Sequence, residues 1–293
     1  MEDAYIAKAT ERIFLAPIRL AIQPEVRDLF MPIEGTAHNL ALVSIVKRYI
    51  GQSAKVAQGL WGAGQMMFNK YMVIAPESCD LRSKSNIFAL LRGLDPQRHL
   101  IFSEGILDVL DHSAPINGYG AKLAIDLTDI TPSEEPLSVD IPGSVVATGG
   151  VELHSDELCA SLGLLTLFCE AEREHIDVEK YLSTNKISGI KYVALFDKGA
   201  AEGMTQSDLL WLAAANTDPK RDIRIIDGIV IIDARSKRPG YGDNPKRFPN
   251  VVTSDAQTIT LVDSRWEEYG IGEKIESPSL RYRKLTLSDK AQW

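Results

Sequence analysis

The feature that most constrains the fold is a strand, helix, strand pattern between residues 40 and 75. Leu40–Val46 (LALVSIV) is an almost unbroken apolar run of strand length, which is typical of a strand buried on both faces. Val56 and Leu60 then lie four residues apart, on one face of a short helix. Tyr71–Ala75 (YMVIA) is a second apolar strand. The pattern predicts a right-handed crossover in a parallel sheet, with residues just beyond the first strand lining any crevice.

Further segments extend this pattern on both sides. Ser83 suits the N-cap of a helix, and Leu100–Phe102 and Lys122–Thr128 have the apolar character of short strands. Towards the N-terminus, Pro24 suits the first position of a short helix that ends at Pro32. We therefore expect an α/β fold of three layers, in which helices cover both faces of a mostly parallel, mixed sheet.

The stretch 129–142 divides the chain. It carries three prolines and four acidic residues without a basic one, so it reads as a linker or surface loop. We expect four parts: a helical lead-in at 1–39, a first α/β lobe at 40–128, the linker or loop at 129–144, and a second α/β lobe with a tail at 145–293.

The second half of the chain resembles the first. Lys70 precedes an apolar strand and lies 95 − 70 = 25 residues before Asp95, and Lys191 precedes another and lies 218 − 191 = 27 residues before Asp218. Both aspartates are followed by proline. Either the lobe is duplicated, or any two strand, helix, strand units that end in Asp-Pro look alike. Between the copies we expect a helix capped by Ser155 that runs to Phe168.

Composition excludes several classes of protein. The formal net charge of −8 leaves no basic face for a phosphate backbone, so nucleic acid is not an expected partner. Cys79, Cys159 and Cys169 lack metal-ligand spacing and suit free thiols in the cytoplasm. The most apolar run, Leu158–Cys169, is far shorter than the roughly 20 residues of a membrane helix, so no integral membrane segment is expected.

Several long motifs occur in the order found in one known family. They are EDAYIAKATERIFLAP, PEVRDLFMPIEGTAHN, VSIVKRYIGQ and LWGAGQMMFNK. Together they resemble the C-terminal part of the UbiD family of decarboxylases. The similarity is clear from Glu2 to Thr128, weak between Asp129 and Ser188, and returns in LLWLAAANTDPKRD, IIDARSKR and SPSLRY.

The resemblance implies a function and a set of partners. UbiD-family enzymes are carboxy-lyases of 4-hydroxybenzoate-type and quinone-precursor acids, and they hold prenylated flavin mononucleotide beside a divalent metal. This chain would be their oligomerising C-terminal domain, which closes a cofactor pocket shared with an N-terminal half. The family's catalytic Glu-Arg-Glu network and its Asn, His and Glu metal ligands belong to that half. We therefore expect no catalytic or metal-binding residue here and no decarboxylation by this chain alone.

Lys47 and Arg48 are the candidate cofactor-binding residues. Both lie just beyond the predicted central strand, close to a helix N-terminus, which is suitable chemistry for a phosphate. By resemblance, the family's C-terminal domain supplies a lysine to the flavin phosphate, and Lys47 is the best match. The alternative is a solvated basic turn. If Lys47 holds the phosphate, its replacement by alanine should weaken cofactor retention and leave folding untouched.

Other polar residues have structural explanations that are preferred. His38 and His112 could titrate near neutrality, but without a nucleophile or ligand cluster we expect hydrogen-bonded structural histidines. Gly62-Ala63-Gly64 follows a helix and not a strand, so it suits a helix stop more than a dinucleotide loop. Four aspartates are expected to cap turns and not to bind a metal: Asp108, Asp111, Asp126 and Asp233.

Two further readings of the chain stay open. It could be an assembly or binding module without chemistry, or an unrelated cytosolic nucleotide-binding enzyme. For the decarboxylase reading, we expect Trp61, Met66, Met67 and Phe68 to pack against the N-terminal half or another subunit.

Overall fold

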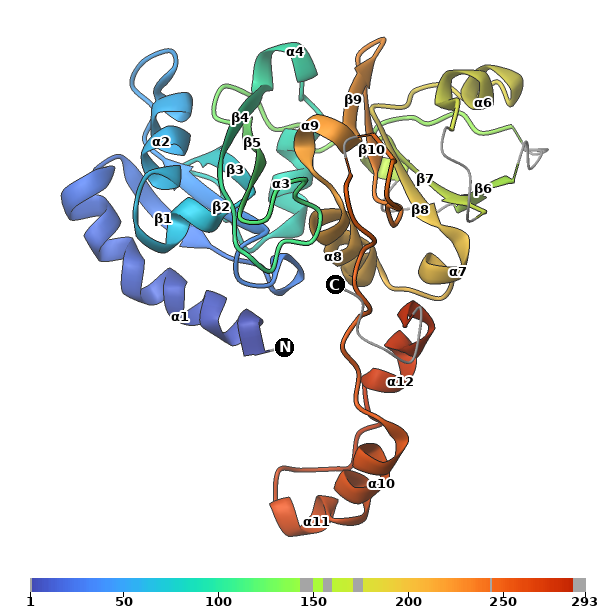
Figure 1. The fold of residues 1–293 in the computed structure, drawn as a ribbon. Helices are drawn as coiled ribbons and strands as arrows, with labels where there is room; N and C mark the ends of the chain where they lie inside the picture. The colour runs from blue at the N-terminus through green and yellow to red at the C-terminus, as the bar shows by residue number, and fades with distance from the viewer. Residues whose placement is uncertain (1, 143–149, 155–159, 171–175, 243, 287–293) are drawn as a thin grey trace.

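The computed structural model shows two lobes side by side and a long arm that projects from them (Figure 1). It describes residues 2–142, 150–154, 160–170, 176–242 and 244–286. Each lobe contains one five-stranded sheet with helices packed on it. The predicted α/β class and the presence of a second α/β lobe are confirmed.

The first lobe contains the following elements in chain order: α1 (Glu2–Pro17), η1 (Ile18–Ile22), β1 (Val26–Phe30), η2 (Ile33–Gly35), β2 (Leu40–Ile45), α2 (Gln52–Trp61), η3 (Gly64–Phe68), β3 (Tyr71–Pro76), α3 (Lys84–Leu91), α4 (Pro96–His99), β4 (Leu100–Ile106) and β5 (Tyr119–Asp126). Its sheet has the order β1-β2-β3-β5-β4. The three central strands are parallel, and β1 and β4 run antiparallel to them at the edges. The sheet is therefore mixed and mostly parallel, as predicted.

Alternate residues of the central strands serve different cores. In β2, Val43 and Ile45 face the layer formed by α1 and α2, whereas Leu42 faces α3 and the second lobe. Side chains of a strand point alternately to its two faces, so a strand covered on both sides needs apolar residues throughout. This explains the run LALVSIV and the three layers of the first lobe.

The second lobe contains β6 (Val151–His154), β7 (Leu164–Cys169), α6 (Val178–Thr184), β8 (Tyr192–Asp197), α7 (Lys198–Ala201), α8 (Gln206–Asn216), α9 (Pro219–Asp222), β9 (Ile223–Ile226) and β10 (Ile229–Asp233). Its sheet has the order β6-β7-β8-β10-β9. The two lobes share one apolar core, in which Leu90 and Leu123 of the first lobe lie with Tyr192 and Val230 of the second.

Two predicted helices are strands in the structure. The helix expected from Pro24 to Pro32 is wrong, because Val26–Phe30 forms β1 and pairs with β2. The helix expected from Ser155 to Phe168 is wrong from Leu164 onwards, where β7 pairs with β6 and β8. Ser155 itself lies outside the described residues. In both segments the spacing of apolar residues is compatible with a helix or with a strand. Pairing with a buried neighbouring strand is what makes each of them a strand.

The position of β1 changes the proposed division of the chain. Residues 1–39 are not a purely helical lead-in, because they supply an edge strand of the first sheet. We propose that the first lobe begins with α1 and that the later boundaries, at 129–144 and 145–293, stand.

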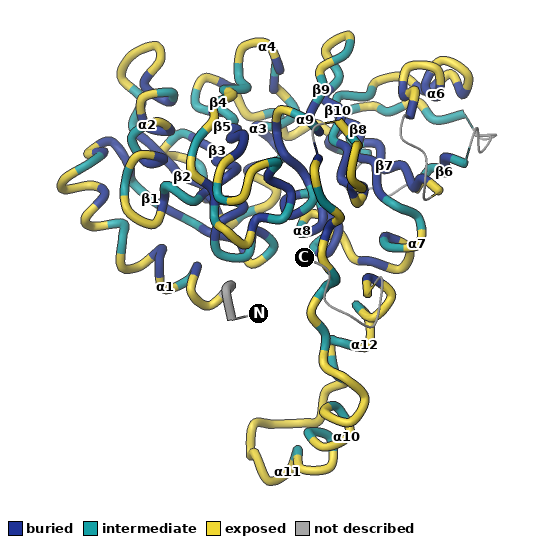
Figure 2. The backbone as a smooth tube through the Cα atoms, in the orientation of Figure 1, coloured by how far each residue is buried: buried dark blue, intermediate teal, exposed yellow. Residues whose placement is uncertain are grey.

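The arm follows the second lobe and is largely exposed, as the yellow tube in Figure 2 shows. It contains α10 (Ala256–Ser264), α11 (Trp266–Tyr269), α12 (Ser279–Tyr282) and η4 (Arg283–Leu285). Its three α-helices have no buried residue, whereas Leu285 at its end returns to the core of the second lobe. Among the described residues, no helix has the length and apolar character to cross a membrane.

Candidate functional site

Lys47 lies two residues beyond β2 and is held by two carboxylates. Its Nζ lies 3.3 Å from Asp126 Oδ2, at the end of β5, and 2.5 Å from Asp129 Oδ2. The Lys47 side chain is only 14% exposed, whereas that of Asp129 is 60% exposed. The Lys47 ammonium is therefore ion-paired and largely buried, and it is not that of a freely solvated turn residue. The effect of its removal on folding stays a prediction.

Asp126 is the inner of the two partners. Burial raises the pKa of its carboxyl, but hydrogen bonds from Thr128 and Ser53 and the charge of Lys47 outweigh burial and lower the pKa overall. The Thr128 N–H donates to Asp126 Oδ1 over 3.0 Å, so Asp126 also caps the turn after β5. Asp126 is thus ionised and fixed in place, and it holds the Lys47 ammonium at the carboxyl end of the sheet.

Arg48 and the start of α2 form the open side of this corner. The Arg48 side chain is exposed, and its main-chain N–H donates to Gln52 Oε1 over 2.6 Å. Gly51, at the N-cap of α2, has a φ of 85° and supplies no side-chain acceptor to the first turn. Such a helix N-terminus beside a guanidinium offers donors to an anion.

These residues fit a phosphate in part. Arg48 and the first turn of α2 are suitable donors, but a phosphate at Lys47 would meet the charges of Asp126 and Asp129. Asp129 is the more exposed partner, so it is the carboxylate that would have to turn away before Lys47 could contact a phosphate. That Lys47 and Arg48 bind the cofactor phosphate therefore stays a prediction. Arg48 could contact a phosphate as it stands, whereas Lys47 would first have to lose its contact with Asp129.

The other sequence candidates have structural roles. Gly62 caps the C-terminus of α2, as expected of a helix stop. The His112 ring lies 2.9 Å from Asn216 Oδ1, and burial lowers the pKa of the imidazole. His38 is buried beside Asp108, with 3.9 Å between Nδ1 and Oδ2. Both histidines thus lie in packed surroundings and not in an open site.

All four candidate aspartates accept a main-chain N–H two residues ahead, as turn caps do. The pairs are Asp108 with Leu110, Asp111 with Ser113, Asp126 with Thr128, and Asp233 with Arg235. In the described part of the chain, no three or more His, Cys, Asp or Glu residues lie together as metal ligands would.

A buried ion pair that the sequence did not reveal lies inside the first lobe. Lys70 Nζ is 2.9 Å from Asp111 Oδ2, and the two side chains are 0% and 1% exposed. Burial by itself raises the pKa of Asp111. The charge of Lys70 and hydrogen bonds from Ser113 and Lys70 outweigh burial, so the pKa is lowered overall and the carboxyl stays ionised. Enclosure of this kind indicates a structural pair. Sequence reasoning named Asp111 as a turn cap and had no signal for its distant partner.

Lys122 is a second buried lysine of the first lobe. Its Nζ donates to the carbonyl oxygens of Met67 and Asn69, at 2.8 Å and 2.6 Å. Burial lowers the pKa of Lys122 to about 7. Lys122 packs beneath Trp61, whose ring centroid lies 5.6 Å from Nζ.

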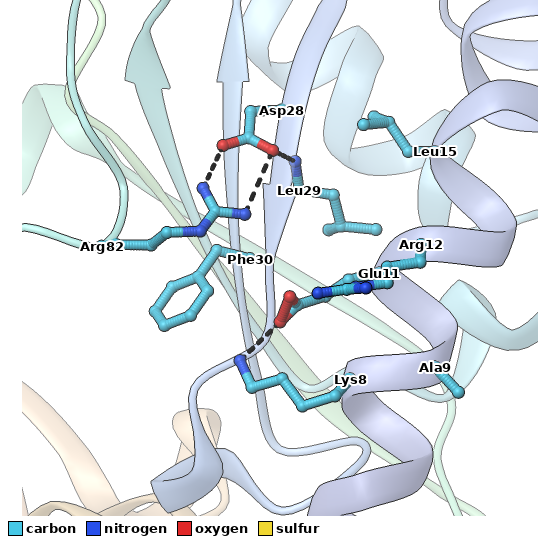
Figure 3. A pocket seen from close by; sticks show the side chains of 9 residues that line it. All are labelled: Lys8, Ala9, Glu11, Arg12, Leu15, Asp28, Leu29, Phe30 and Arg82. Atoms are coloured by element: carbon cyan, nitrogen blue, oxygen red, sulfur yellow. Dashed lines mark hydrogen bonds and ion pairs between the residues drawn. The ribbon is translucent and has the colours of Figure 1, made fainter.

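An open pocket of about 510 Å³ lies between α1 and the edge strand β1 (Figure 3). Its carboxylates are already paired: Glu11 with Lys8 at 2.6 Å, and Asp28 with Arg82. The Phe30 ring lies 4.1 Å from Lys8 Nζ. With both carboxylates neutralised, the pocket supplies no acid and base pair, and neither Lys47 nor Arg48 lines it.

The expected contact surface around α2 and η3 is wrong in part. Trp61 and Met66 are only 7% and 2% exposed and belong to the core of the first lobe. A different apolar cluster is exposed at the turn between β4 and β5, comprising Ile106, Val109, Leu110, Ile116 and Tyr119.

The chain resembles a known family model, several sequence relatives and several solved structures. Residues 4–127 match the family model described as the 3-octaprenyl-4-hydroxybenzoate carboxy-lyase C-terminal domain, UbiD_C. This match contains all five strands of the first sheet.

Curated relatives match between 44% and 81% of the chain. An uncharacterised protein of Archaeoglobus fulgidus is 43% identical over 130 residues, which are 44% of this chain and 27% of that protein. An uncharacterised protein of Helicobacter pylori is 30% identical over 250 residues, or 81% of this chain and 39% of that protein. The chain thus spans well under half the length of these relatives.

Solved structures that resemble the chain include two decarboxylases. Vanillic acid decarboxylase of Sedimentibacter hydroxybenzoicus in open form is 24% identical, covers 45% of this chain and 28% of its own, and has a TM-score of 0.40. A UbiD-class enzyme of Pelotomaculum thermopropionicum in complex with FMN is 18% identical, covers 51% and 32%, and has a TM-score of 0.39.

The resemblance predicted from the motifs between Glu2 and Thr128 is thus confirmed by the family model, which begins at residue 4 and ends at residue 127. The first lobe of this chain is a C-terminal domain of the UbiD family.

Proposed function

We propose that this chain supplies the C-terminal part of a UbiD-type carboxy-lyase in the cytoplasm. Its substrate would be an aromatic or quinone-precursor acid, such as a derivative of 4-hydroxybenzoate. The observation that carries the proposal is the family match over residues 4–127, which is the whole first lobe. The catalytic groups would come from an N-terminal half, so the chain alone would be inactive.

The proposed cofactor is prenylated flavin mononucleotide, held between the two halves, with a divalent metal bound outside these residues. Arg48 and the first turn of α2 would hold the flavin phosphate, and Lys47 would join them once Asp129 turns away. When bound, the flavin supplies the chemistry of decarboxylation. The residues of this chain would bind the phosphate and close the pocket.

The exposed apolar cluster at the β4 and β5 turn supports a role in assembly. Val109 and Leu110 are 67% and 61% exposed, and Ile106 pairs with Tyr119 beside them. Clustered exposed apolar residues commonly mark a protein interface. We propose that this turn contacts the N-terminal half or a second copy of the chain.

Reconstitution tests the proposal. The chain is purified alone and together with the N-terminal portion of the Archaeoglobus fulgidus relative, with prenylated flavin supplied to both. We expect flavin absorbance to be retained, and carbon dioxide to be released from a panel of aromatic acids, only when both parts are present. Stable association without flavin would favour the assembly module instead. Turnover by the chain alone would contradict the proposal.

Asp129→Asn sharpens the test of the phosphate contact. Removing the exposed competitor should tighten flavin retention by about 0.5 to 1 kcal/mol, because a phosphate at Lys47 then meets one carboxylate fewer. Glu135→Gln removes another carboxylate of the same loop, and is a matched control for net charge. Equal flavin retention by both variants would exclude Lys47 as a phosphate contact.

A further inference from the structure

We propose that residues 151–233 are a second, degenerate copy of the domain formed by residues 26–126, and that this copy acts as the second subunit of an internal dimer. The family match ends at residue 127 and leaves the second lobe unassigned. The inference rests on topology, on matching capping motifs, and on a reciprocal contact between the lobes.

The two sheets have the same order and the same strand directions. Numbered in chain order within each sheet, strands two, three and five are parallel to one another. Strand one runs antiparallel to strand two, and strand four runs antiparallel to strand five. The second sheet repeats every one of these relations. Two unrelated α/β units would share the parallel crossover, but not both antiparallel edges in the same chain order.

Strand register makes the equivalence specific to residues. Tyr71 pairs with Leu40 on one side and Leu123 on the other. Tyr192 occupies the same place in the second sheet, between Leu164 and Val230. The lysine predicted to mark the repeat therefore precedes an equivalent tyrosine in both lobes.

The Asp-Pro motifs match in more than sequence. Asp95 caps α4 by accepting the N–H of Gln97, and its own N–H donates to His99 Nδ1 over 2.8 Å. Asp218 caps α9 by accepting the N–H of Lys220, and its own N–H donates to Asp222 Oδ2, also over 2.8 Å.

Each of these caps lies five residues before the next strand, which starts at Leu100 in the first lobe and at Ile223 in the second. An Asp-Pro helix start explains the first bond of each pair. The second bond, from the cap N–H to the side chain four residues on, is not required by that start. Its presence in both lobes favours duplication over chance similarity.

The lobes contact each other reciprocally through these same elements. The Tyr71 hydroxyl lies 2.5 Å from Thr217 Oγ1, just after α8 of the other lobe. Thr217 itself donates to the Ala213 carbonyl, so Tyr71 is the donor. In the opposite direction, the Tyr192 hydroxyl donates to the carbonyl of Leu91, at the end of α3, over 2.7 Å.

A lysine contact completes the exchange, because Lys191 Nζ donates to the carbonyl of Leu94 over 3.0 Å. Leu94 and Thr217 are equivalent, since each directly precedes the capping aspartate. Burial raises the pKa of both tyrosines, so their hydroxyls stay protonated as donors. Tyr71 and Tyr192 themselves belong to the shared apolar core, and the two lobes lie side by side (Figure 1). An approximate two-fold relation between copies produces this kind of exchange.

Hydrogen exchange of the full chain in increasing denaturant, read by mass spectrometry, tests the proposal. We expect the most protected amides of β2 and β8 to lose protection at one denaturant concentration. Tyr71→Phe and Tyr192→Phe should each accelerate exchange in both lobes about 2- to 10-fold, the effect of one hydrogen bond.

Tyr181→Phe is the matched control, because the buried Tyr181 hydroxyl of α6 has no hydrogen-bond partner among the described residues. It should leave exchange unchanged. Separate midpoints for the two lobes would overturn the internal dimer, and so would variants that affect only their own lobe. An experimental structure with another strand order in the second sheet would overturn the duplication.

Discussion

The two lobes differ most where equivalent strands end. In the first lobe, β2 leads into Val46 and Lys47, which lies beside Asp126. In the second, β7 leads into Glu170, and the next residue in sequence is Ala171. Asp233 keeps the place of Asp126, but its charged partners are Arg235 and Lys237, which follow its own strand, and not a lysine that follows another strand of the sheet. The same fold therefore carries a lysine beyond the strand end in one copy and a glutamate at the equivalent strand end in the other, so a shared topology does not imply a shared binding site.

The lobes also differ in how their outer faces are covered. In the first lobe, α1 and α2 pack on one face of the sheet over a core that contains residues of β1, β2 and β3. In the second, α6 is a helix of seven residues, and a cavity of about 560 Å³ remains between it and the hairpin of β9 and β10. Because this pocket leaves apolar surface in contact with water, we expect the α6 face of the second lobe to be less stable than the α1 and α2 face of the first.

The largest difference in unfolding free energy between the two lobes is expected for substitutions of the equivalent lysines, Lys70 and Lys191. Lys70→Met leaves Asp111 charged and buried without its ammonium, which should cost about 3 to 5 kcal/mol of unfolding free energy. Lys191→Met removes a single bond to the Leu94 carbonyl and should cost about 1 kcal/mol. Urea denaturation of both variants measures the difference. Equal losses would show that the buried pair is not specific to the first lobe.

The capping aspartates should differ by a smaller amount. Asp95→Ala removes one cap and should cost about 1 kcal/mol. Asp218→Ala should cost about 2 to 3 kcal/mol, because Asp218 Oδ2 also accepts the Ala121 N–H across the lobe boundary over 3.0 Å. Thermal unfolding gives both values. A larger loss in Asp95→Ala would contradict the interlobe role of Asp218.

The smallest effect at neutral pH is expected at Lys122, whose equivalent in β10 is Ile229. Above pH 7 the folded Lys122 is neutral, whereas the lysine of the unfolded chain still binds a proton until about pH 10.4. Unfolding therefore takes up a proton, and stability rises with pH in this window. Relative to Lys122→Ile, the wild-type unfolding free energy should rise by up to about 1.4 kcal/mol per pH unit between pH 7 and 10. Parallel pH curves would contradict the lowered pKa.

Local patterns were sufficient for much of the fold. The strands at Leu40 and Tyr71, the helix between them and the Ser83 cap follow from apolar spacing and cap chemistry within a few residues. β1 and β7 were missed, because what makes each a strand is a partner elsewhere in the sheet.

The sequence was sufficient to predict where the candidate site lies in the sheet, but not which side chains surround it. Strand order alone places Lys47 at the carboxyl end of the sheet, but its burial depends on Asp126 and Asp129, which are distant in sequence. The ion pair of Lys70 and Asp111 was not predicted for the same reason, since the sequence around a lysine before a strand does not indicate a partner that is distant in sequence.

The most direct test compares flavin retention when the strand ends of the two lobes are altered in the reconstituted protein. Lys47→Ala removes the basic strand end of the first lobe and should weaken retention by about 1.5 to 3 kcal/mol, the range for a charged hydrogen bond. Glu170→Gln alters the equivalent end of the second lobe and should retain flavin as the unchanged protein does. Unaltered retention in Lys47→Ala, or an equal loss in Glu170→Gln, would contradict a cofactor site confined to the first lobe.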